Sequence, residues 1–277
     1  MLPSVYYWLR VQSSPDTAEL DQFRLMELGA LGTEEEEKTA TVIRACFETP
    51  EALAEARAAF GEAAIDGGES PWEDWDRSWR ERQVPVEVTP RLVVCPPWVD
   101  APANGEHVIR LEAKMAFGTG SHESTRIASL LMESLQLLEK SVLDVGTGTG
   151  ILAIYAAQLG AGRSVGFDID PVAGPCLREN LDLNPMSAGV PEFYVGTLDA
   201  LKPQARFDII VVNMIRTETW PYLGDLVERL APGGRLVFSG QRVEDQPHWT
   251  EWFDKAGVSV VGEVTLGEWW GFAATRR

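Results

Sequence analysis

The chain is short of cysteine, of histidine and of positive charge. Its 277 residues include only three cysteines and three histidines, and Cys46, Cys95 and Cys176 are scattered along the sequence. Their odd number and wide spacing exclude a disulfide framework and a cysteine metal motif, and favour a reducing compartment. We therefore predict that the cysteines are small buried hydrophobic residues and that the protein has no metal site.

Long hydrophobic runs are also missing. DIIVVNMI (208–215) is among the longest apolar stretches, far below the roughly 20 residues that span a bilayer. The first residues, MLPSVYYWLRVQSSPD, lack the basic start and long apolar stretch of a signal peptide. The sequence thus predicts a cytoplasmic protein with no membrane partner, and we expect a monomer.

Basic residues are outnumbered, with 24 Lys and Arg against 42 Asp and Glu, for a net charge of −18. Residues 1–100 alone hold 20 acidic and 9 basic side chains. Such a surface repels phosphate backbones, which disfavours direct binding of nucleic acid. It would attract a basic protein substrate, although solubility or a salty cytoplasm would explain the acidity equally well.

The first 67 residues predict a small α+β domain. Val5–Val11 and Thr41–Phe47 have the composition of strands, a helix from Thr17 ends at Gly29, and PEALAEARAAF (50–60) is a helix closed by Gly61. This strand–helix order is typical of a ferredoxin-like fold. The acidic run 34–37 is predicted to be a solvated loop or strand edge.

A boundary is expected at Asp66-Gly67-Gly68, followed by a linker over residues 68–83. Trp72, Trp75 and Trp79 share one helical face there, which favours a connecting helix packed on a neighbouring domain. From residue 84 to 277 we predict one large domain. Strands and helices alternate after Ser141 and end in a hairpin, which indicates a doubly wound, seven-stranded α/β sheet.

The most specific motif is VLDVGTGTG (142–150), where a short apolar strand with the carboxylate Asp144 runs into three glycines. Gly146, Gly148 and Gly150 precede a helical segment, and this strand–turn–helix position is where α/β sheets bind nucleotide-like ligands. The dinucleotide fingerprint requires glycine at the sixth position, which here is Ile151. The GxGxG spacing resembles that of S-adenosylmethionine-dependent methyltransferases more than that of dehydrogenases.

Polar residues follow three further strands. Asp168 lies 22 residues after Gly146, a position at which an acidic residue accepts hydrogen bonds from ribose hydroxyls. The alternative is that Asp168 caps the next helix, but Asp170 is better placed for that role. Asp199 either bonds an adenine amino group or caps the next helix. Asn213 ends an apolar strand, which places it beside the reacting methyl group. The residues after Asn213 are not two prolines and an aromatic, which argues against planar amide or nucleobase acceptors.

A second motif is MAFGTGSHEST (115–125). Thr125 either caps the helix that begins there or bonds the amino-acid end of the cofactor. His122 could be a general base, but a structural histidine that forms hydrogen bonds is the more common role.

Together these segments resemble the ribosomal protein L11 methyltransferase family. The matching pieces are EDWDRSWRE, LVVCPPW, MAFGTGSHESTR, VLDVGTGTGILAIYAAQLGA, GFDIDP, VVNMI and LAPGGRLVFSG. The resemblance implies a Rossmann-like catalytic domain, a linker helix, an N-terminal substrate-recognition domain, and cofactor contacts at Thr125, Gly146, Asp168 and Asn213. One departure is Glu112-Ala113-Lys114, where many members have Asp-Pro-Gly.

The resemblance also implies methyl transfer from S-adenosylmethionine to lysine side chains and an α-amino group of this basic ribosomal protein. We expect that no side chain acts as a dedicated catalytic base. Asn213 would position the amine, and Phe117 would line the pocket. The alternatives are a methyltransferase of another protein lysine or of a small-molecule amine, a nicotinamide dehydrogenase, and a non-catalytic ribosome assembly factor.

Overall fold

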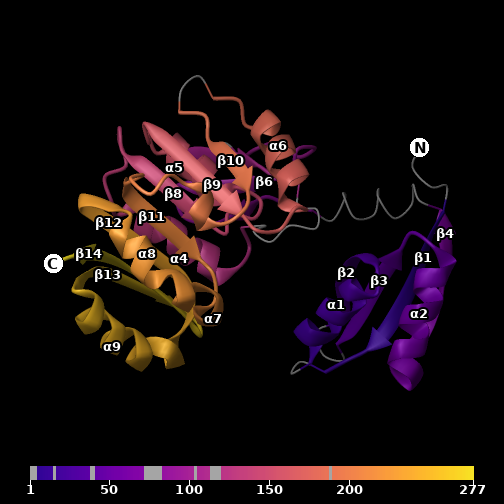
Figure 1. The fold of residues 1–277 in the computed structure, drawn as a ribbon. Helices are drawn as coiled ribbons and strands as arrows, with labels where there is room; N and C mark the ends of the chain where they lie inside the picture. Colours follow the sequence, from indigo (N-terminus) through magenta and orange to yellow (C-terminus); the bar gives the residue numbers. More distant parts are fainter. Residues whose placement is uncertain are drawn as a thin grey trace. The chain divides into compact units, whose positions relative to one another are not determined.

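The computed structural model describes residues 5–14, 17–37, 41–71, 83–102, 105–112, 120–186 and 189–277. By their contacts the residues form two compact units, Met1–Gln83 and Val84–Arg277 (Figure 1). None of the helices in these ranges is both long and apolar enough to cross a membrane.

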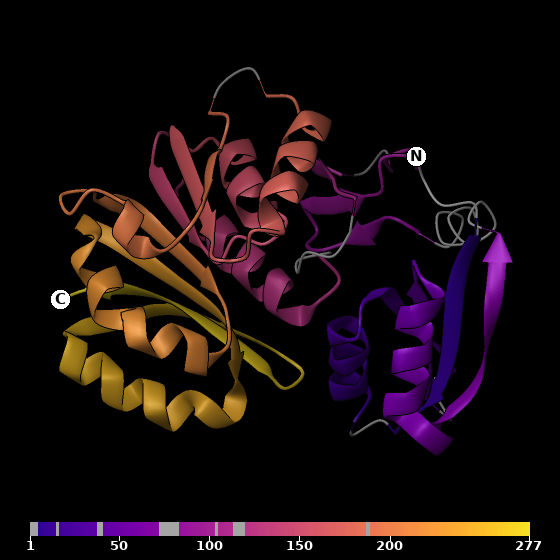
Figure 2. The same cartoon turned by 45° about the vertical axis from the view of Figure 1, so that its right-hand side comes forward.

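The first unit is one antiparallel sheet with two helices on one face. Its elements are β1 (Val5–Gln12), α1 (Ala18–Glu27), β2 (Ala30–Glu37), β3 (Val42–Phe47), α2 (Pro50–Phe60), η1 (Gly61–Ala63) and β4 (Ala64–Pro71). The strand order β2-β3-β1-β4 confirms the predicted ferredoxin-like arrangement. Leu9, Ile43 and Phe47 of the sheet pack with Leu25 and Ala56 of the helices in one small core. Figure 2 shows both helices on the same face of the sheet.

One prediction for this region is confirmed and one needs correction. The acidic run, predicted to be a solvated loop or strand edge, lies in β2, an edge strand of the sheet, which is the second of these alternatives. The boundary placed at residue 67 falls inside β4, where Gly67 pairs with Leu9 and Gly68 with Trp8. A Cβ on Gly67 would lie 2.8 Å from the Trp8 carbonyl oxygen, so glycine here permits close strand pairing instead of marking a linker. The predicted linker helix falls mostly on residues 72–82, which lie outside the described residues.

The second unit opens with a three-stranded sheet of β5 (Val86–Glu87), β6 (Leu92–Cys95) and β7 (His107–Arg110), followed by α4 (Glu123–Glu133). The large sheet and its connections then follow as β8 (Ser141–Val145), α5 (Ile151–Gln158), β9 (Arg163–Asp168), α6 (Ala173–Leu183), β10 (Glu192–Val195), η2 (Leu198–Ala200), β11 (Phe207–Asn213), α7 (Arg216–Thr219), η3 (Trp220–Tyr222), α8 (Leu223–Glu228), β12 (Leu230–Arg242), η4 (Val243–Asp245), α9 (Gln246–Ala256), β13 (Val258–Leu266) and β14 (Trp269–Arg276).

The strand order β10-β9-β8-β11-β12-β14-β13 confirms the predicted seven-stranded, doubly wound sheet. Pairing is parallel from β10 to β12 and antiparallel for β14, the second strand of the closing hairpin. Alternate residues of β11 point to opposite faces of the sheet. Ile209 and Val211 pack in the core that includes α4 and α5. Ile210 and Val212 pack in the core that includes α8 and α9. Both faces are therefore covered, and the strand ends remain available for a ligand.

Candidate active site

The strand register brings the predicted residues to one edge of the large sheet. Asp144 of β8 lies opposite Val211 of β11, two residues before Asn213 ends that strand. Asp168 ends β9 opposite Val195, the last residue of β10. Because these four strands are parallel, their carboxyl ends meet at the same edge, where a doubly wound fold binds its ligand.

The glycine loop joins β8 to α5, as its sequence predicts. Gly146, Gly148 and Gly150 have φ values of 67°, 53° and 85°, a region that disfavours residues with a Cβ. A Cβ on Gly146 would also lie only 2.7 Å from Sδ of Met214, the residue after Asn213. The loop therefore requires glycine both for its dihedrals and for its close approach to the end of β11.

Asp144 is a buried carboxylate that anchors this loop from inside β8. Its Oδ2 accepts hydrogen bonds from Thr147 Oγ1 at 2.6 Å and from the Ala153 amide at 3.2 Å. Burial raises the pKa of Asp144 to about 7, although both hydrogen bonds act to lower it. Its Oδ1 is buried with no partner among the described residues, so it can accept a hydrogen bond from a ligand.

Asp168 holds the same loop from the neighbouring strand. Its Oδ2 accepts from the Gly148 amide at 2.9 Å and its Oδ1 from the Asp170 amide at 3.0 Å. Asp170 Oδ1 accepts from the Val172 amide at 2.9 Å, and the Asp170 carbonyl accepts from the Ala173 amide at 3.1 Å, so Asp170 and not Asp168 caps the turn that leads into α6. Asp199 is exposed within η2 after β10; the cap there is Thr197, so the alternative of a capping Asp199 is not what the structure shows.

Thr125 and Asn213 meet where α4 begins beside the end of β11. Asn213 Nδ2 lies 3.5 Å from Thr125 Oγ1, and Thr125 is fully buried in the first turn of α4. Thr125 is thus not the helix cap, one of its two predicted roles. The Asn213 Oδ1 atom is buried without a partner in the described part of the chain, which leaves a hydrogen-bond acceptor at this end of the site.

His122 is the cap of α4. Its Nδ1 accepts from the Ser124 amide at 3.1 Å and lies 2.7 Å from Ser124 Oγ, and its ring packs edge-on against Trp269 at 4.6 Å. The Nδ1 lone pair that accepts from the Ser124 amide is not available to take a proton from a substrate in this arrangement. This geometry favours the structural role over the general base. Phe117, the other predicted contact, lies outside the described residues.

Sequence reasoning missed the residues that support this edge from β12. Ser239 Oγ donates to the Ser124 carbonyl at 2.6 Å, and Gln241 Nε2 donates to the Met214 carbonyl at 2.6 Å. Both side chains are buried at the end of an otherwise apolar strand. Buried polar residues after LVF were the signal that could have identified them.

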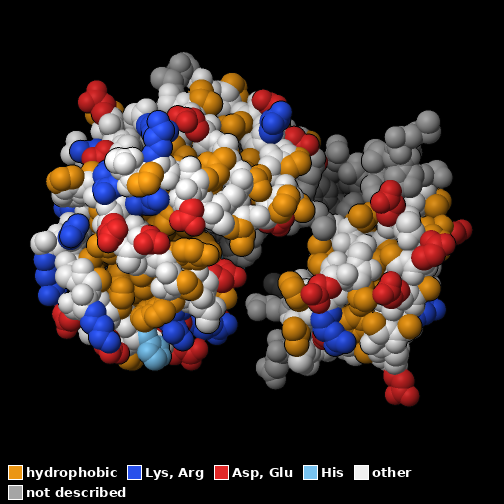
Figure 3. Space-filling model, viewed as in Figure 1, with side chains coloured by type: hydrophobic (Ala, Val, Ile, Leu, Met, Phe, Trp, Pro, Cys, Tyr) orange, Lys and Arg blue, Asp and Glu red, His pale blue; other side chains and the backbone are white. Residues whose placement is uncertain are grey.

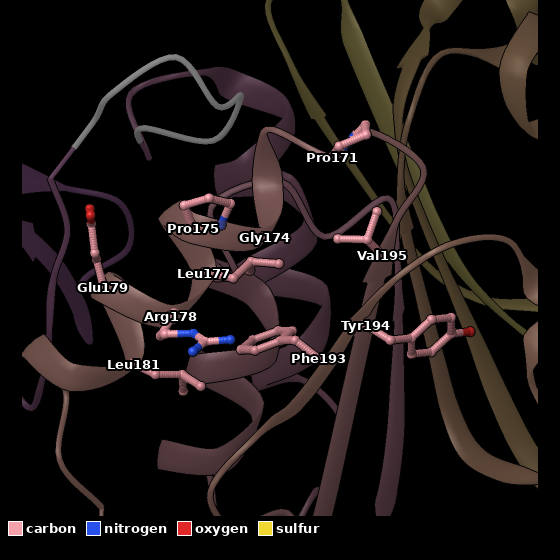
Figure 4. A pocket seen from close by; sticks show the side chains of 10 residues that line it. All are labelled: Pro171, Gly174, Pro175, Leu177, Arg178, Glu179, Leu181, Phe193, Tyr194 and Val195. Atoms are coloured by element: carbon pink, nitrogen blue, oxygen red, sulfur yellow. The ribbon is translucent and has the colours of Figure 1, made fainter.

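A cavity of about 730 Å³ lies between α6 and the edge strand β10 (Figure 4). Arg178 and Leu181 of α6 approach Phe193 across it, while Pro171 and Val195 lie at the end nearest the strand termini. None of the predicted site residues that the structure describes lines this cavity. It therefore lies beside the site and does not form it.

The arrangement fits a ligand that carries both a nucleoside and an amino acid. Asp144 Oδ1 and Asn213 Oδ1 are buried acceptors without a hydrogen-bond partner among the described residues, and the glycine loop near them has no room for side chains. Such acceptors suit the amino and hydroxyl donors of S-adenosylmethionine. Within the described ranges, no group of three or more His, Cys, Asp or Glu side chains is placed to hold a metal ion.

A family model described as "Ribosomal protein L11 methyltransferase (PrmA)" matches residues 16–277. The chain belongs to the ribosomal protein L11 methyltransferase family. One relative so named, from Geobacter sulfurreducens, is 40% identical over 221 residues, 78% of this chain and 72% of its own length. Another, from Geobacter metallireducens, is 36% identical over 273 residues, 92% of this chain and 86% of its own.

A solved structure described as a ribosomal protein L11 methylase, from Lactobacillus delbrueckii subsp. bulgaricus, superposes with a TM-score of 0.64 at 28% identity. It covers 70% of this chain and 100% of its own. Membership of the L11 methyltransferase family confirms the predicted methyltransferase fold, enzyme class and cofactor, S-adenosylmethionine. The dehydrogenase alternative is thereby excluded.

Proposed function

We propose that this protein methylates lysine side chains and the α-amino group of ribosomal protein L11. The observation that carries the proposal is the pair Asn213 and Thr125 beside the glycine loop, in a chain whose relatives are named for L11. A basic protein substrate also suits the net charge of −18. The same charge disfavours nucleic acid as the substrate, and we propose that the protein acts as a cytoplasmic monomer.

Asp144, Asp168 and Asn213 would hold the cofactor, together with the backbone of Gly146, Gly148 and Gly150 and the hydroxyl of Thr125. Asp199 lies after β10 at the same edge, where it would meet the adenine. When bound, S-adenosylmethionine supplies a methyl carbon on a positively charged sulfur that is its own leaving group. The protein therefore has to align a neutral amine and keep water away.

Asn213 would align that amine. Its free Oδ1 would accept a hydrogen bond from the amine N–H, which directs the nitrogen lone pair away from the side chain. Free lysine has a pKa of about 10.4, so the amine must lose a proton on entering. Desolvation beside a cationic ligand lowers the pKa of the amine, and its proton can leave through water. No side chain is required as a base.

The unit Met1–Gln83 would recognise the substrate protein, and residues 72–82 would connect it to the catalytic unit. A test of the whole proposal incubates the full-length protein with radiolabelled S-adenosylmethionine and total ribosomal proteins plus ribosomal RNA. The expected result is label on L11, on lysine and N-terminal nitrogens. Label on RNA alone, or only on another protein or a small amine, would contradict it.

Replacing His122 distinguishes alignment from general-base catalysis. His122→Asn keeps a side chain that caps helices well, so we expect L11 methylation within a few-fold of the unsubstituted protein and an unchanged pH profile. Asn213→Ala should lower kcat by about a hundredfold, since the amine loses its only direct partner proposed here. Loss of the acidic limb of the pH profile in His122→Asn would identify His122 as the base instead.

A further inference from the structure

Exposed apolar side chains cluster in the two loops that leave β11 and β12 beside Asn213. Ile215 is 49%, Trp220 39% and Val243 38% exposed. Figure 3 shows hydrophobic side chains gathered over α8 and α9, and η3, which begins with Trp220, directly precedes α8. Single exposed apolar residues are common, but three on adjoining loops next to a reactive site suggest a contact surface.

Direct contacts hold the two loops together. Gln241 Nε2 donates to the Met214 carbonyl at 2.6 Å, and Arg216 Nε donates to Asp245 Oδ1 at 2.7 Å. The Arg216 guanidinium also lies over the Trp220 ring at 5.7 Å. A surface fixed in this way loses little conformational entropy when a partner binds.

Trp220 is supported from below as well. Its ring packs edge-on against the buried Trp249 at 5.6 Å, and Thr219 Oγ1 donates to the Ile215 carbonyl at 3.0 Å. The exposed faces of these side chains are therefore presented on a fixed base. Aromatic side chains held on a fixed base are the kind that dominate binding energy in protein interfaces.

The charges of these loops are negative on balance. Arg216 is paired with Asp245, and Arg242 is paired with Glu268 at 2.9 Å. Glu218 of α7 and Glu244 of η4 are exposed and have no ion pair among the described residues. Two uncompensated carboxylates beside apolar side chains fit a segment that carries both positive and apolar groups.

We name these residues the β11–β12 surface; it consists of Ile215, Glu218, Trp220, Val243 and Glu244. We propose that the β11–β12 surface docks the basic polypeptide segment that flanks the methylated amine of the substrate protein. Ile215 is two residues from Asn213, and two residues of chain span at most about 7 Å. The residues next to a target lysine are therefore within reach of the surface.

This proposal rests on the proposed methylation of L11. Its test uses the full-length protein with Ile215→Ser and Val243→Ser combined, and separately with Glu218→Gln and Glu244→Gln combined. The apolar pair should raise the KM for unmethylated L11 by about tenfold with kcat nearly unchanged. The charge pair should raise the KM by about threefold at low salt, and this effect should vanish at high salt.

Matched controls are Val261→Ser and Glu263→Gln, which change exposed residues of β13, two strands away from β12 in the sheet. They should leave the KM for L11 unchanged, and calorimetry should give every variant the unsubstituted affinity for S-adenosylmethionine. If the unsubstituted protein methylates L11 but the substituted variants have the same KM as the controls, the docking surface alone is overturned. An unsubstituted protein that binds the cofactor without methylating L11 would overturn the proposed function and this surface with it.

Discussion

The two main sheets of the molecule present their polar residues in different places. The sheet of the second unit has helices on both faces, so its functional polar groups gather at the strand ends, as Asp168 and Asn213 do. Within the residues that the structure describes, the sheet of the first unit has helices on one face. Its other face carries Arg44 over the Trp8 ring at 5.0 Å and Arg10 paired with Glu36 at 2.7 Å.

This difference bears on where a small ligand can bind. In a sheet with helices on both faces, the strand ends form a narrow edge, and the backbone there can approach a small ligand closely. The other face of the first sheet combines aromatic and charged side chains, a composition found in protein interfaces, but Tyr6 and Cys46 on this face are only 3% exposed. The comparison therefore supports placing the cofactor in the second unit.

The largest effect on cofactor binding should come from adding a side chain to the glycine loop at the strand ends of the second unit. Gly146→Ala places a Cβ at positive φ, costing about 1–2 kcal/mol, and against Met214, costing about 1–3 kcal/mol more. The affinity for S-adenosylmethionine, measured by calorimetry, should fall roughly a hundredfold or more. Gly233→Ala is the control, because Gly233 also has a positive φ of 76° but nothing lies within 4 Å of its added Cβ. Equal losses in both variants would show that strain, not the edge, sets the affinity.

The next effect tests whether the two sheets are independent. Leu9 is fully buried in the core of the first unit, so Leu9→Ala should lower the free energy of unfolding of that unit by about 2–5 kcal/mol. The affinity for S-adenosylmethionine should not change, because Leu9 belongs to a different core from the strands of the site. Ile210→Ala, in the core of the second unit, should weaken both stability and cofactor binding. A drop in cofactor affinity in Leu9→Ala would mean that the two cores are coupled.

The sequence predicted the second unit more fully than the first, and the same contrast explains why. Strands that are buried on both faces of the sheet appear in the sequence as apolar runs that end in glycine or a polar residue. The strands β8, β9 and β11 and their end residues could therefore be located. In the first unit, β4 reads AIDGGESP, and its two glycines resemble a linker. Only its pairing with β1 shows that they permit close strand approach, and that pairing is a long-range contact.

Within the site, local motifs predicted the glycine loop but not its partners. The hydrogen bond from the Gly148 amide to Asp168 joins residues 20 apart, and the contact between Asn213 and Thr125 joins residues 88 apart. The capping role of His122 depends on a side-chain rotamer that no spacing specifies. These features depend on tertiary packing, which short motifs do not encode.

The smallest effect concerns buried and paired carboxylates in the two sheets. Asp144 keeps its proton up to a pKa of about 7 in the folded protein, whereas the unfolded chain releases it near its ordinary value of 3.8. Between these values the folded state binds more protons than the unfolded state, so the Asp144 contribution to stability falls as the pH rises from about 4 to about 7. Asp144→Asn removes that dependence. The stability of Asp144→Asn relative to the unsubstituted protein should therefore improve on the order of 3 kcal/mol over this range, measured by urea unfolding without cofactor. Glu36→Gln, which breaks a partly exposed pair in the first sheet, should shift stability by less than about 1 kcal/mol. A flat difference between Asp144→Asn and the unsubstituted protein across this range would show that the carboxylate is ionised in the folded sheet.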